Sequence, residues 1–149
     1  MTRRLAVMAA LAALGCGGHP ASTTPVPATM DQALTQFLNG VKDNNKQQMG
    51  ATWGTEKGPA AESMSSKELD QRLTVIQKYL ANKGFKVMLG PQPVTGHDEL
   101  RTYQVQLVRD RCPHVQPIDV IRTRGGGWLV FDVHLEAATT LAQGCAPGT

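Results

Sequence analysis

Apolar residues in the first half of the chain recur every three or four positions, the period of an amphipathic helix. One such segment begins after Thr29, which stands three residues before Gln32 in the spacing of a capping box. Its apolar positions are Met30, Ala33, Leu34, Phe37, Leu38 and Val41. A second, shorter helix is predicted over residues 44–52, before the segment WGTEKGPA breaks the pattern. The pattern therefore predicts two consecutive helices over residues 29–52.

The most regular helical pattern covers residues 65–82. Ser65 and Glu68 again have the spacing of a capping box. The apolar positions behind them are Leu69, Leu73, Ile76 and Leu80. Lys83 and Gly84 are expected to end this helix, because a cation suits the negative end of the helix dipole and glycine can adopt the left-handed cap.

After Gly84 the apolar period shortens from about 3.6 to 2, which indicates β-strands. The strands are predicted at residues 85–89, 102–107, 118–121 and 128–135. Pro91 and Pro93 are expected to close the first strand, and the glycines of TRGGGW to form a hairpin turn before the last. The second and third strands are expected to be antiparallel. Three helices followed by four strands predict an α+β domain with its N-terminal helices on one face of an antiparallel sheet.

The N-terminus combines a short basic region, an apolar run and a cysteine. Arg3 and Arg4 precede ten small or apolar residues, the layout of a signal peptide, and the run is too short to span a membrane. The sequence ALGC at 13–16 resembles the lipobox of bacterial lipoproteins. This resemblance implies cleavage before Cys16 and acylation of Cys16, and Gly17 permits sorting to the outer membrane. The alternative is an ordinary secretory signal with a chance cysteine.

These patterns divide the chain into four segments. They are a signal peptide at 1–15, a tether rich in Pro, Gly, Ser and Thr at 16–28, a folded domain at 29–137 and a C-terminal tail at 138–149. Fifteen basic residues face twelve acidic ones, and two of the basic residues lie in the leader. The mature chain is thus close to neutral, which argues against a nucleic-acid partner.

Two segments carry a resemblance to a fold family. They are ALTQFLNGVKDNNKQQMGATWG, an N-terminal helix pair, and TRGGGWLVFDVHLEA, a last hairpin with a Gly-Trp-apolar-aromatic-Asp ending. Together with the order of elements they resemble the nuclear transport factor 2-like superfamily. The resemblance implies a cystatin-like cone, in which a curved four-stranded sheet wraps against helices and leaves a pocket at its open end. It implies no single activity, because this fold hosts enzymes, binding modules and assembly domains.

The remaining cysteines suggest a disulfide. If Cys16 is acylated, Cys112 and Cys145 are left as a pair in an oxidising compartment, and the alternative is two free thiols. Cys112 also lies near His114, and His134 could add a third ligand, but this spacing is not that of a zinc site. No metal or cofactor is therefore expected.

The last predicted strand carries the candidate acid–base residues. Strict alternation places one set of residues together, namely Trp128, Val130, Asp132 and His134. The opposite set is more apolar and is expected to meet the helices; its members are Leu129, Phe131, Val133 and Leu135. Asp132 and His134 would then face solvent. If the pocket receives them instead, they could act as a catalytic acid–base pair.

Arginines gather in the second and third predicted strands and in the turns beside them. They are Arg101, Arg109, Arg111, Arg122 and Arg124. Cross-strand ion pairs with Asp110 and Asp119 are the expected role. The alternative is a patch that contacts anionic lipid or polysaccharide.

The resulting hypothesis is a lipid-anchored protein of the bacterial cell envelope, with its domain in the periplasm or at the cell surface. Its expected role is non-catalytic, either binding a small apolar ligand or docking to an envelope protein. Phe37, Trp53 and Tyr103 are the candidate pocket residues. The alternatives are an isomerase- or cyclase-like enzyme and a structural envelope component. A deep apolar pocket favours binding, a buried pocket carboxylate with a raised pKa favours catalysis, and an exposed apolar patch on a filled core favours docking.

Overall fold

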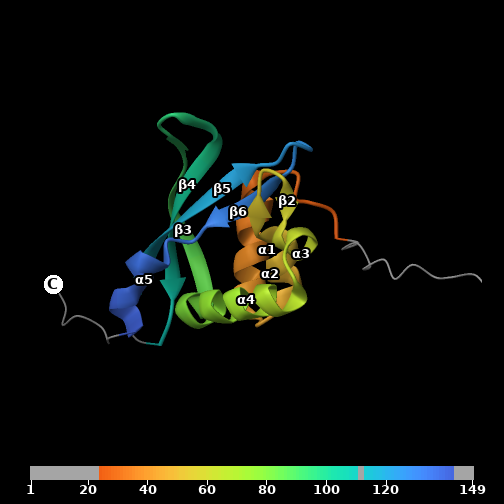
Figure 1. The fold of residues 1–149 in the computed structure, drawn as a ribbon. Coiled ribbons are helices and arrows are strands. Elements are labelled where there is room, and N and C mark those ends of the chain that lie inside the picture. The colour runs from red at the N-terminus through yellow and green to blue at the C-terminus, as the bar shows by residue number, and fades with distance from the viewer. Residues whose placement is uncertain (1–23, 111–112, 143–149) are drawn as a thin grey trace, which may run out of the picture.

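A computed structural model of the 149-residue chain describes residues 24–110 and 113–142. Within these ranges the chain forms an α+β fold, as the sequence predicted (Figure 1). The N-terminal part contains α1 (Met30–Lys42), α2 (Lys46–Thr52), β1 (Gly54–Thr55), β2 (Gly58–Pro59), α3 (Ala60–Ser63) and α4 (Ser66–Leu80). The C-terminal part contains β3 (Gly84–Val94), β4 (His97–Val108), β5 (His114–Arg122), β6 (Trp128–Asp132) and α5 (Leu135–Ala142).

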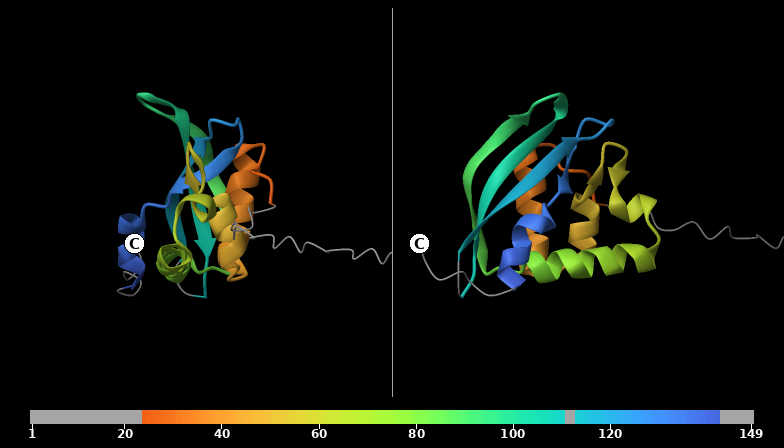
Figure 2. Two further views of the ribbon diagram at one scale, coloured as in Figure 1. Left: turned by 45° about the vertical axis from the view of Figure 1, so that its right-hand side comes forward. Right: turned by 60° about the vertical axis from the view of Figure 1, so that its left-hand side comes forward.

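The main sheet is an open antiparallel meander. Its strands follow one another in the order β3-β4-β5-β6, and β3 and β6 form the edges. The antiparallel pairing of β4 with β5 confirms the predicted neighbours. Figure 2 shows the sheet curving, with α1 against one face and α5 beside the C-terminal half of α4. None of the helices in the described part of the chain is both long and apolar enough to cross a membrane.

The N-cap residues of both predicted capping boxes start their helices. The Thr29 hydroxyl accepts the N–H of Gln32 at 3.2 Å, and the Ser65 hydroxyl accepts the N–H of Glu68 at 3.3 Å. Each bond satisfies a backbone donor that the first turn of a helix leaves unpaired, and is worth about 1 kcal/mol. The predicted starts of α1 and α4 are thereby confirmed.

The core lies between the helices and the sheet. Buried apolar side chains from α1, α4 and the strands form one cluster; its members include Leu34, Phe37, Leu38, Val41, Leu73, Ile76, Leu80, Tyr103, Val105, Ile118 and Val120. Full burial stabilises each such side chain by about 1.5–3 kcal/mol. The Tyr103 hydroxyl donates to Asp31 Oδ1 at 2.6 Å, so the first turn of α1 is joined to the middle of the sheet.

The end of α4 differs from the prediction. The helix stops at Leu80, and Gly84 opens β3 instead of capping the helix. The Asn82 side chain donates to the Leu80 carbonyl at 2.9 Å, which satisfies one acceptor left free at the helix end. The N–H of Lys83 bonds to the Val108 carbonyl at 2.8 Å. The chain is therefore drawn into the sheet before a glycine cap can form.

The first long strand also differs, because Pro91 and Pro93 do not end it. Strand β3 runs through both prolines to Val94. It is an edge strand, so backbone N–H groups on its outer side have no ladder partner to lose. The prediction that these prolines close the strand was therefore wrong.

The last strand is shorter than predicted and its alternation fails. Pairing shifts between Asp119↔Asp132 and Val120↔Val130, so β6 holds one extra residue, a β-bulge. As a result Val130 joins the main core, while Phe131 is 38% exposed. The predicted strand over 128–135 was wrong beyond Asp132, because His134 adopts a left-handed φ of 45° and α5 begins at Leu135.

Part of the predicted tether packs against the domain. Val26 contacts a small apolar cluster formed by Leu100, Ile121 and Leu129. The Pro27 carbonyl accepts the N–H of Trp128 at 2.8 Å. At the other end, α5 continues the fold past residue 137, where the tail was expected to begin. The packed part of the chain therefore extends beyond the expected segment at both ends.

Candidate ligand-binding cleft

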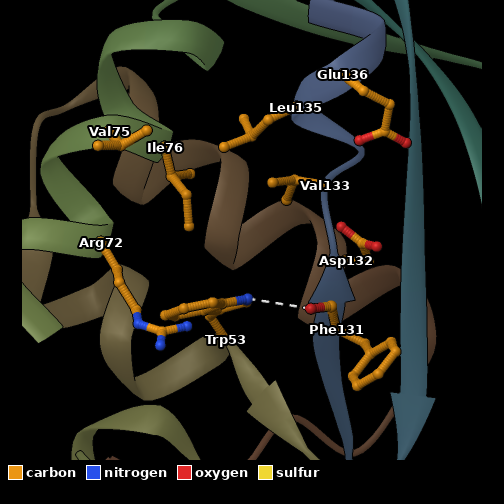
Figure 3. A pocket seen from close by; sticks show the side chains of 9 residues that line it. All are labelled: Trp53, Arg72, Val75, Ile76, Phe131, Asp132, Val133, Leu135 and Glu136. Atoms are coloured by element: carbon orange, nitrogen blue, oxygen red, sulfur yellow. Dashed lines mark hydrogen bonds between the residues drawn. The ribbon is translucent and has the colours of Figure 1, made fainter. Parts of the chain in front are cut away.

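A cleft of about 340 Å³ opens between α4 and the segment that joins β6 to α5 (Figure 3). Its lining residues are Trp53, Arg72, Val75, Ile76, Phe131, Asp132, Val133, Leu135 and Glu136. Six of these nine are apolar, so the cleft suits an apolar ligand with few polar groups.

Trp53 is held between α2 and β6. Its backbone forms a parallel bridge with Val130, and its indole Nε1–H donates to the Phe131 carbonyl at 3.1 Å. The next residue must be glycine, because a Cβ on Gly54 would lie 2.2 Å from the Gly58 carbonyl oxygen. The tight β1–β2 hairpin therefore fixes the tryptophan ring at the wall of the cleft.

The apolar lining is partly open to solvent. Ile76 and Val133 are only 4% exposed, whereas Val75 is 45% exposed and Phe131 is 38% exposed. Val75 extends the predicted apolar face of α4 by one position, beside Ile76. The inner wall is thus part of the core, and the rim presents apolar surface to water.

Charged side chains stand on opposite walls. Arg72 comes from α4 and pairs with Glu68 at 2.9 Å, with both side chains about half exposed. Asp132 and Glu136 come from the β6–α5 segment, across the cleft in Figure 3. A ligand would therefore meet a cationic group on one side and carboxylates on the other.

A smaller cavity of about 200 Å³ adjoins the cleft and shares Trp53, Arg72 and Phe131 with it. Met64 and Ala60 lie on its far side. The cleft and the smaller cavity meet at Trp53, so together they form one elongated, mostly apolar surface.

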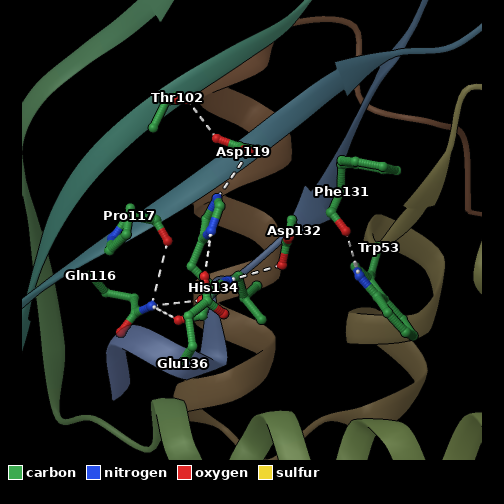
Figure 4. A network of polar contacts seen from close by, with 10 residues as sticks. Trp53, Thr102, Gln116, Pro117, Asp119, Phe131, Asp132, His134 and Glu136 are labelled. Atoms are coloured by element: carbon green, nitrogen blue, oxygen red, sulfur yellow. Dashed lines mark hydrogen bonds and ion pairs between the residues drawn. The ribbon is translucent and has the colours of Figure 1, made fainter. Parts of the chain in front are cut away.

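His134 forms a polar network behind the cleft (Figure 4). Its Nε2 lies 2.9 Å from Asp119 Oδ2, and its Nδ1 lies 2.9 Å from Glu136 Oε1. The other oxygen of Asp119 accepts the Thr102 hydroxyl at 2.5 Å. Gln116 is fully buried, and its amide donates to the Val133 and His134 carbonyls at 2.6 and 2.9 Å.

The network raises the pKa of His134. Burial of the ring lowers that pKa, but hydrogen bonds to Asp119 and Glu136 and the negative charge of Asp132 outweigh the burial and raise it above the ordinary 6.5. The pKa of Glu136 is lowered, first by a backbone hydrogen bond and then by His134. The network therefore favours an imidazolium between ionised carboxylates.

The residues expected to line a pocket lie in different parts of the structure. Phe37 and Tyr103 are 0% and 1% exposed in the filled core and do not line the cleft. Trp53 does line it. Asp132 lines the cleft as an exposed carboxylate, while His134 lies behind the wall and contacts Asp119 and Glu136.

The arginines do not pair as expected. Asp110 pairs with Lys83, and Asp119 contacts Thr102 and His134. Four of the five arginines fall in the described ranges. Arg101 donates to the Asp98 and Leu100 carbonyls, Arg109 donates to the Tyr79 carbonyl, Arg124 pairs with Glu56, and Arg122 is exposed. Backbone carbonyls therefore take the place of the expected carboxylates at Arg101 and Arg109.

The predicted cysteine sites and one arginine fall on residues that the structure does not describe. They are Cys16, Cys112, Cys145 and Arg111. Over residues 24–110 and 113–142, no group of three or more His, Cys, Asp or Glu side chains could hold a metal ion. His114 instead lies 3.2 Å from the Gln116 side-chain oxygen.

Comparison with known proteins gives no relative to transfer a role from. No family model matches the chain, and no curated protein or solved structure matches it significantly.

Of the nine lining residues, only Trp53 and Asp132 were named from the sequence as candidate site residues. Arg72, Val75 and Glu136 were not singled out, and the other four were assigned to the apolar face of a helix or of the last strand. One signal was present. Asp132, His134 and Glu136 alternate with apolar residues, and this spacing brings three titratable groups to one bend.

Proposed function

We propose that the protein is a non-catalytic binding module that holds a small apolar ligand in the cleft beside Trp53. The observation that carries this proposal is the cleft itself: about 340 Å³, mostly apolar, with exposed valine and phenylalanine side chains at its rim. Its volume is within the range of about 300–1,000 Å³ usual for small-molecule sites. Water in contact with this apolar lining would be released by a bound ligand, which favours binding.

The cystatin-like cone is part of this proposal. An open, curved antiparallel sheet with helices on one face supports it. So does the position of the cleft, which opens where β6 leaves the sheet. In a cone of this kind the ligand would enter between α4 and α5.

The lipid anchor is likewise proposed, on the pattern of residues 1–16 alone. Two or three acyl chains on one residue hold a protein stably at a membrane, because each buried methylene contributes about 0.8 kcal/mol. Cys16→Ser should release the protein from membranes and abolish labelling by a fatty-acid probe. Unchanged membrane fractionation would contradict the anchor.

Ligand binding is also better supported than catalysis or protein docking. A general acid at neutral pH needs a raised carboxyl pKa, but the pKa of Glu136 is lowered, and Asp132 is exposed. Docking finds some support in Val87, Met88 and Leu89, which are 42–55% exposed on edge strand β3. However, that edge carries bulges and two prolines, devices that discourage strand addition. Ligand binding is therefore the function that the geometry supports best.

Binding can be tested with N-phenyl-1-naphthylamine, a neutral apolar probe that accepts energy from tryptophan. The chain has two tryptophans, so Trp128→Phe leaves Trp53 as the only donor. We expect saturable energy transfer from Trp53 to the probe. Val75→Glu should weaken this binding by about tenfold or more, because it places a charge where the ligand excludes water.

Val115→Glu is the matched control. Val115 is 42% exposed, against 45% for Val75, but it lies on β5 and does not line the cleft. Both variants should unfold at similar temperatures. Equal probe affinity for the two variants, or no saturable transfer at all, would overturn the proposed site.

A further inference from the structure

We infer that the cleft takes an anionic amphiphile, a long apolar chain that ends in one carboxylate, and that Arg72 recognises the acidic group. The inference rests on the proposed function, because it names the chemical class of the ligand. It is carried by the position of Arg72 relative to the apolar lining and to the carboxylates of the opposite wall.

Arg72 lies where the cleft and the smaller cavity meet. In the described part of the chain it is the only basic residue that lines either space, and it lines both of them. Figure 3 shows its guanidinium group beside the Trp53 ring, at the end of the cleft away from Leu135 and Glu136. An acidic group bound at this end is therefore within reach of Arg72.

The guanidinium group of Arg72 can accommodate a ligand carboxylate. It has five N–H donors, arranged as a planar fork that matches the two oxygens of a carboxylate. Its hydrogen bond to Glu68 uses Nη2, and both side chains of that ion pair are about half exposed. Exposed ion pairs within one helix contribute little to stability, so a ligand can share or replace Glu68 at small cost.

The apolar lining continues from Arg72 along α4. Val75 and Ile76 follow Arg72 by three and four residues, which places them on the same side of the helix one turn further on. Val133 and Leu135 lie across the cleft from them (Figure 3). A chain whose acid is held by Arg72 can thus extend between these walls and cover Val75, which is 45% exposed.

The carboxylates of the opposite wall disfavour the reverse orientation. Asp132 and Glu136 would repel an acidic group placed beside them. Both also contact His134: Asp132 Oδ1 accepts its N–H at 3.0 Å, and Glu136 Oε1 lies 2.9 Å from its Nδ1. The raised pKa of His134 favours a positive charge next to both carboxylates, which makes them poorer partners for a cationic ligand. The cleft should therefore prefer an acid to an amine with the same chain.

Three ligands with one chain and different head groups test this preference: decanoate, decanol and decylammonium. Each displaces N-phenyl-1-naphthylamine from the Trp128→Phe protein, below its own micelle concentration and at about pH 7, where the acid and the amine are both charged. Energy transfer from Trp53 reports the displacement. We expect decanoate to bind about fivefold or more tightly than decylammonium.

Arg72→Met tests the residue, because methionine keeps much of the apolar stem and removes the charge. This variant should lower the affinity for decanoate by about fivefold or more and change the affinity for decanol by less than about twofold. Lys78→Met is the matched control. Lys78 is also an exposed basic residue of α4, but it lines neither the cleft nor the smaller cavity, so its replacement should leave decanoate binding unchanged.

The outcomes separate this inference from the proposed function. The inference is overturned if decanoate does not displace a bound probe, or if decylammonium displaces the probe equally well. It is also overturned if Arg72→Met weakens decanoate no more than decanol, or no more than Lys78→Met does. In each of these cases the probe still binds and the proposed function stands. If N-phenyl-1-naphthylamine itself does not bind saturably, the proposed function fails, and this inference fails with it.

Discussion

The space between α1 and the sheet is filled with side chains, whereas the space between α4 and the β6–α5 segment is an open cleft. Between α1 and the sheet, the largest side chains are fully buried, with Phe37 at 0% and Tyr103 at 1% exposure. Between α4 and the β6–α5 segment, Val75 and Phe131 remain about 40% exposed. Strand β6 contributes residues to both regions, so its presence alone does not determine whether a region is filled or open.

The difference lies in the regularity of the surfaces that meet. Helix α1 presents a continuous apolar face to the sheet, and the packed side chains between them approach the density of an organic crystal. Helix α4 instead meets a bulged strand end followed by His134 in a left-handed conformation. Because the chain bends at this point, its side chains do not pack evenly along α4, and a cleft remains between them.

The strongest test of this comparison uses one residue type in the two regions. Phe37→Ala should cost about 3–5 kcal/mol of unfolding free energy, because it leaves a cavity in the filled core. Phe131→Ala should cost only roughly 1 kcal/mol, because the ring is already 38% exposed. Chemical denaturation with urea measures both, and equal losses would contradict the contrast between the regions.

A smaller effect is expected where the filled region is closed by a polar pair. Tyr103→Phe removes the hydroxyl that donates to Asp31 and should cost about 1.5–3 kcal/mol. Burial, the hydrogen bond to Asp31 and the charge of Asp31 raise the pKa of Tyr103 well above its usual 10. The stabilisation is therefore complete below about pH 10 and is lost as pH rises through the raised pKa.

Urea unfolding at neutral and alkaline pH tests this pair. The difference between Tyr103→Phe and the unaltered protein should shrink above about pH 10. A pH-independent difference for Tyr103→Phe would argue against the raised pKa.

The smallest effect is expected on the rim of the cleft. Glu68→Gln breaks an exposed ion pair with Arg72 one helical turn away. Such pairs contribute about 0.5 kcal/mol or less, so thermal unfolding should hardly change. A loss above about 1 kcal/mol would show that this rim is as tightly coupled as the core.

Helices α1, α2 and α4, the caps that start α1 and α4, and the order of the four long strands could be predicted because they depend on local spacing. The faces of α1 and α4 and the starts at Thr29 and Ser65 agree with the structure. The ends of β3 and β6 did not follow from spacing. A proline tolerated at an edge depends on how the strands are ordered in the sheet. The left-handed His134 bonds to the nearby Asp132 and also to Gln116, which is 18 residues away in the chain.

The cleft was even harder to predict, and for a similar reason. Aromatic size suggested Phe37 and Tyr103 as pocket residues, yet large rings also fill cores best. Of the three, Trp53 alone lines the cleft. What separates a lining residue from a core residue here is the bend before α5, and no period in the sequence records it.

The packing of Val26 and Pro27 against the last hairpin has a mechanical consequence. If the protein is held at a membrane through Cys16, any pull on the domain enters the fold at these residues, at the Pro27–Trp128 hydrogen bond and the Val26 contacts. The hydrogen bond and the Val26 contacts lie at the edge of the sheet, beside Leu129. A pulling force would first detach Val26 and Pro27 from the sheet, and it would act on α1 and the cleft only after that.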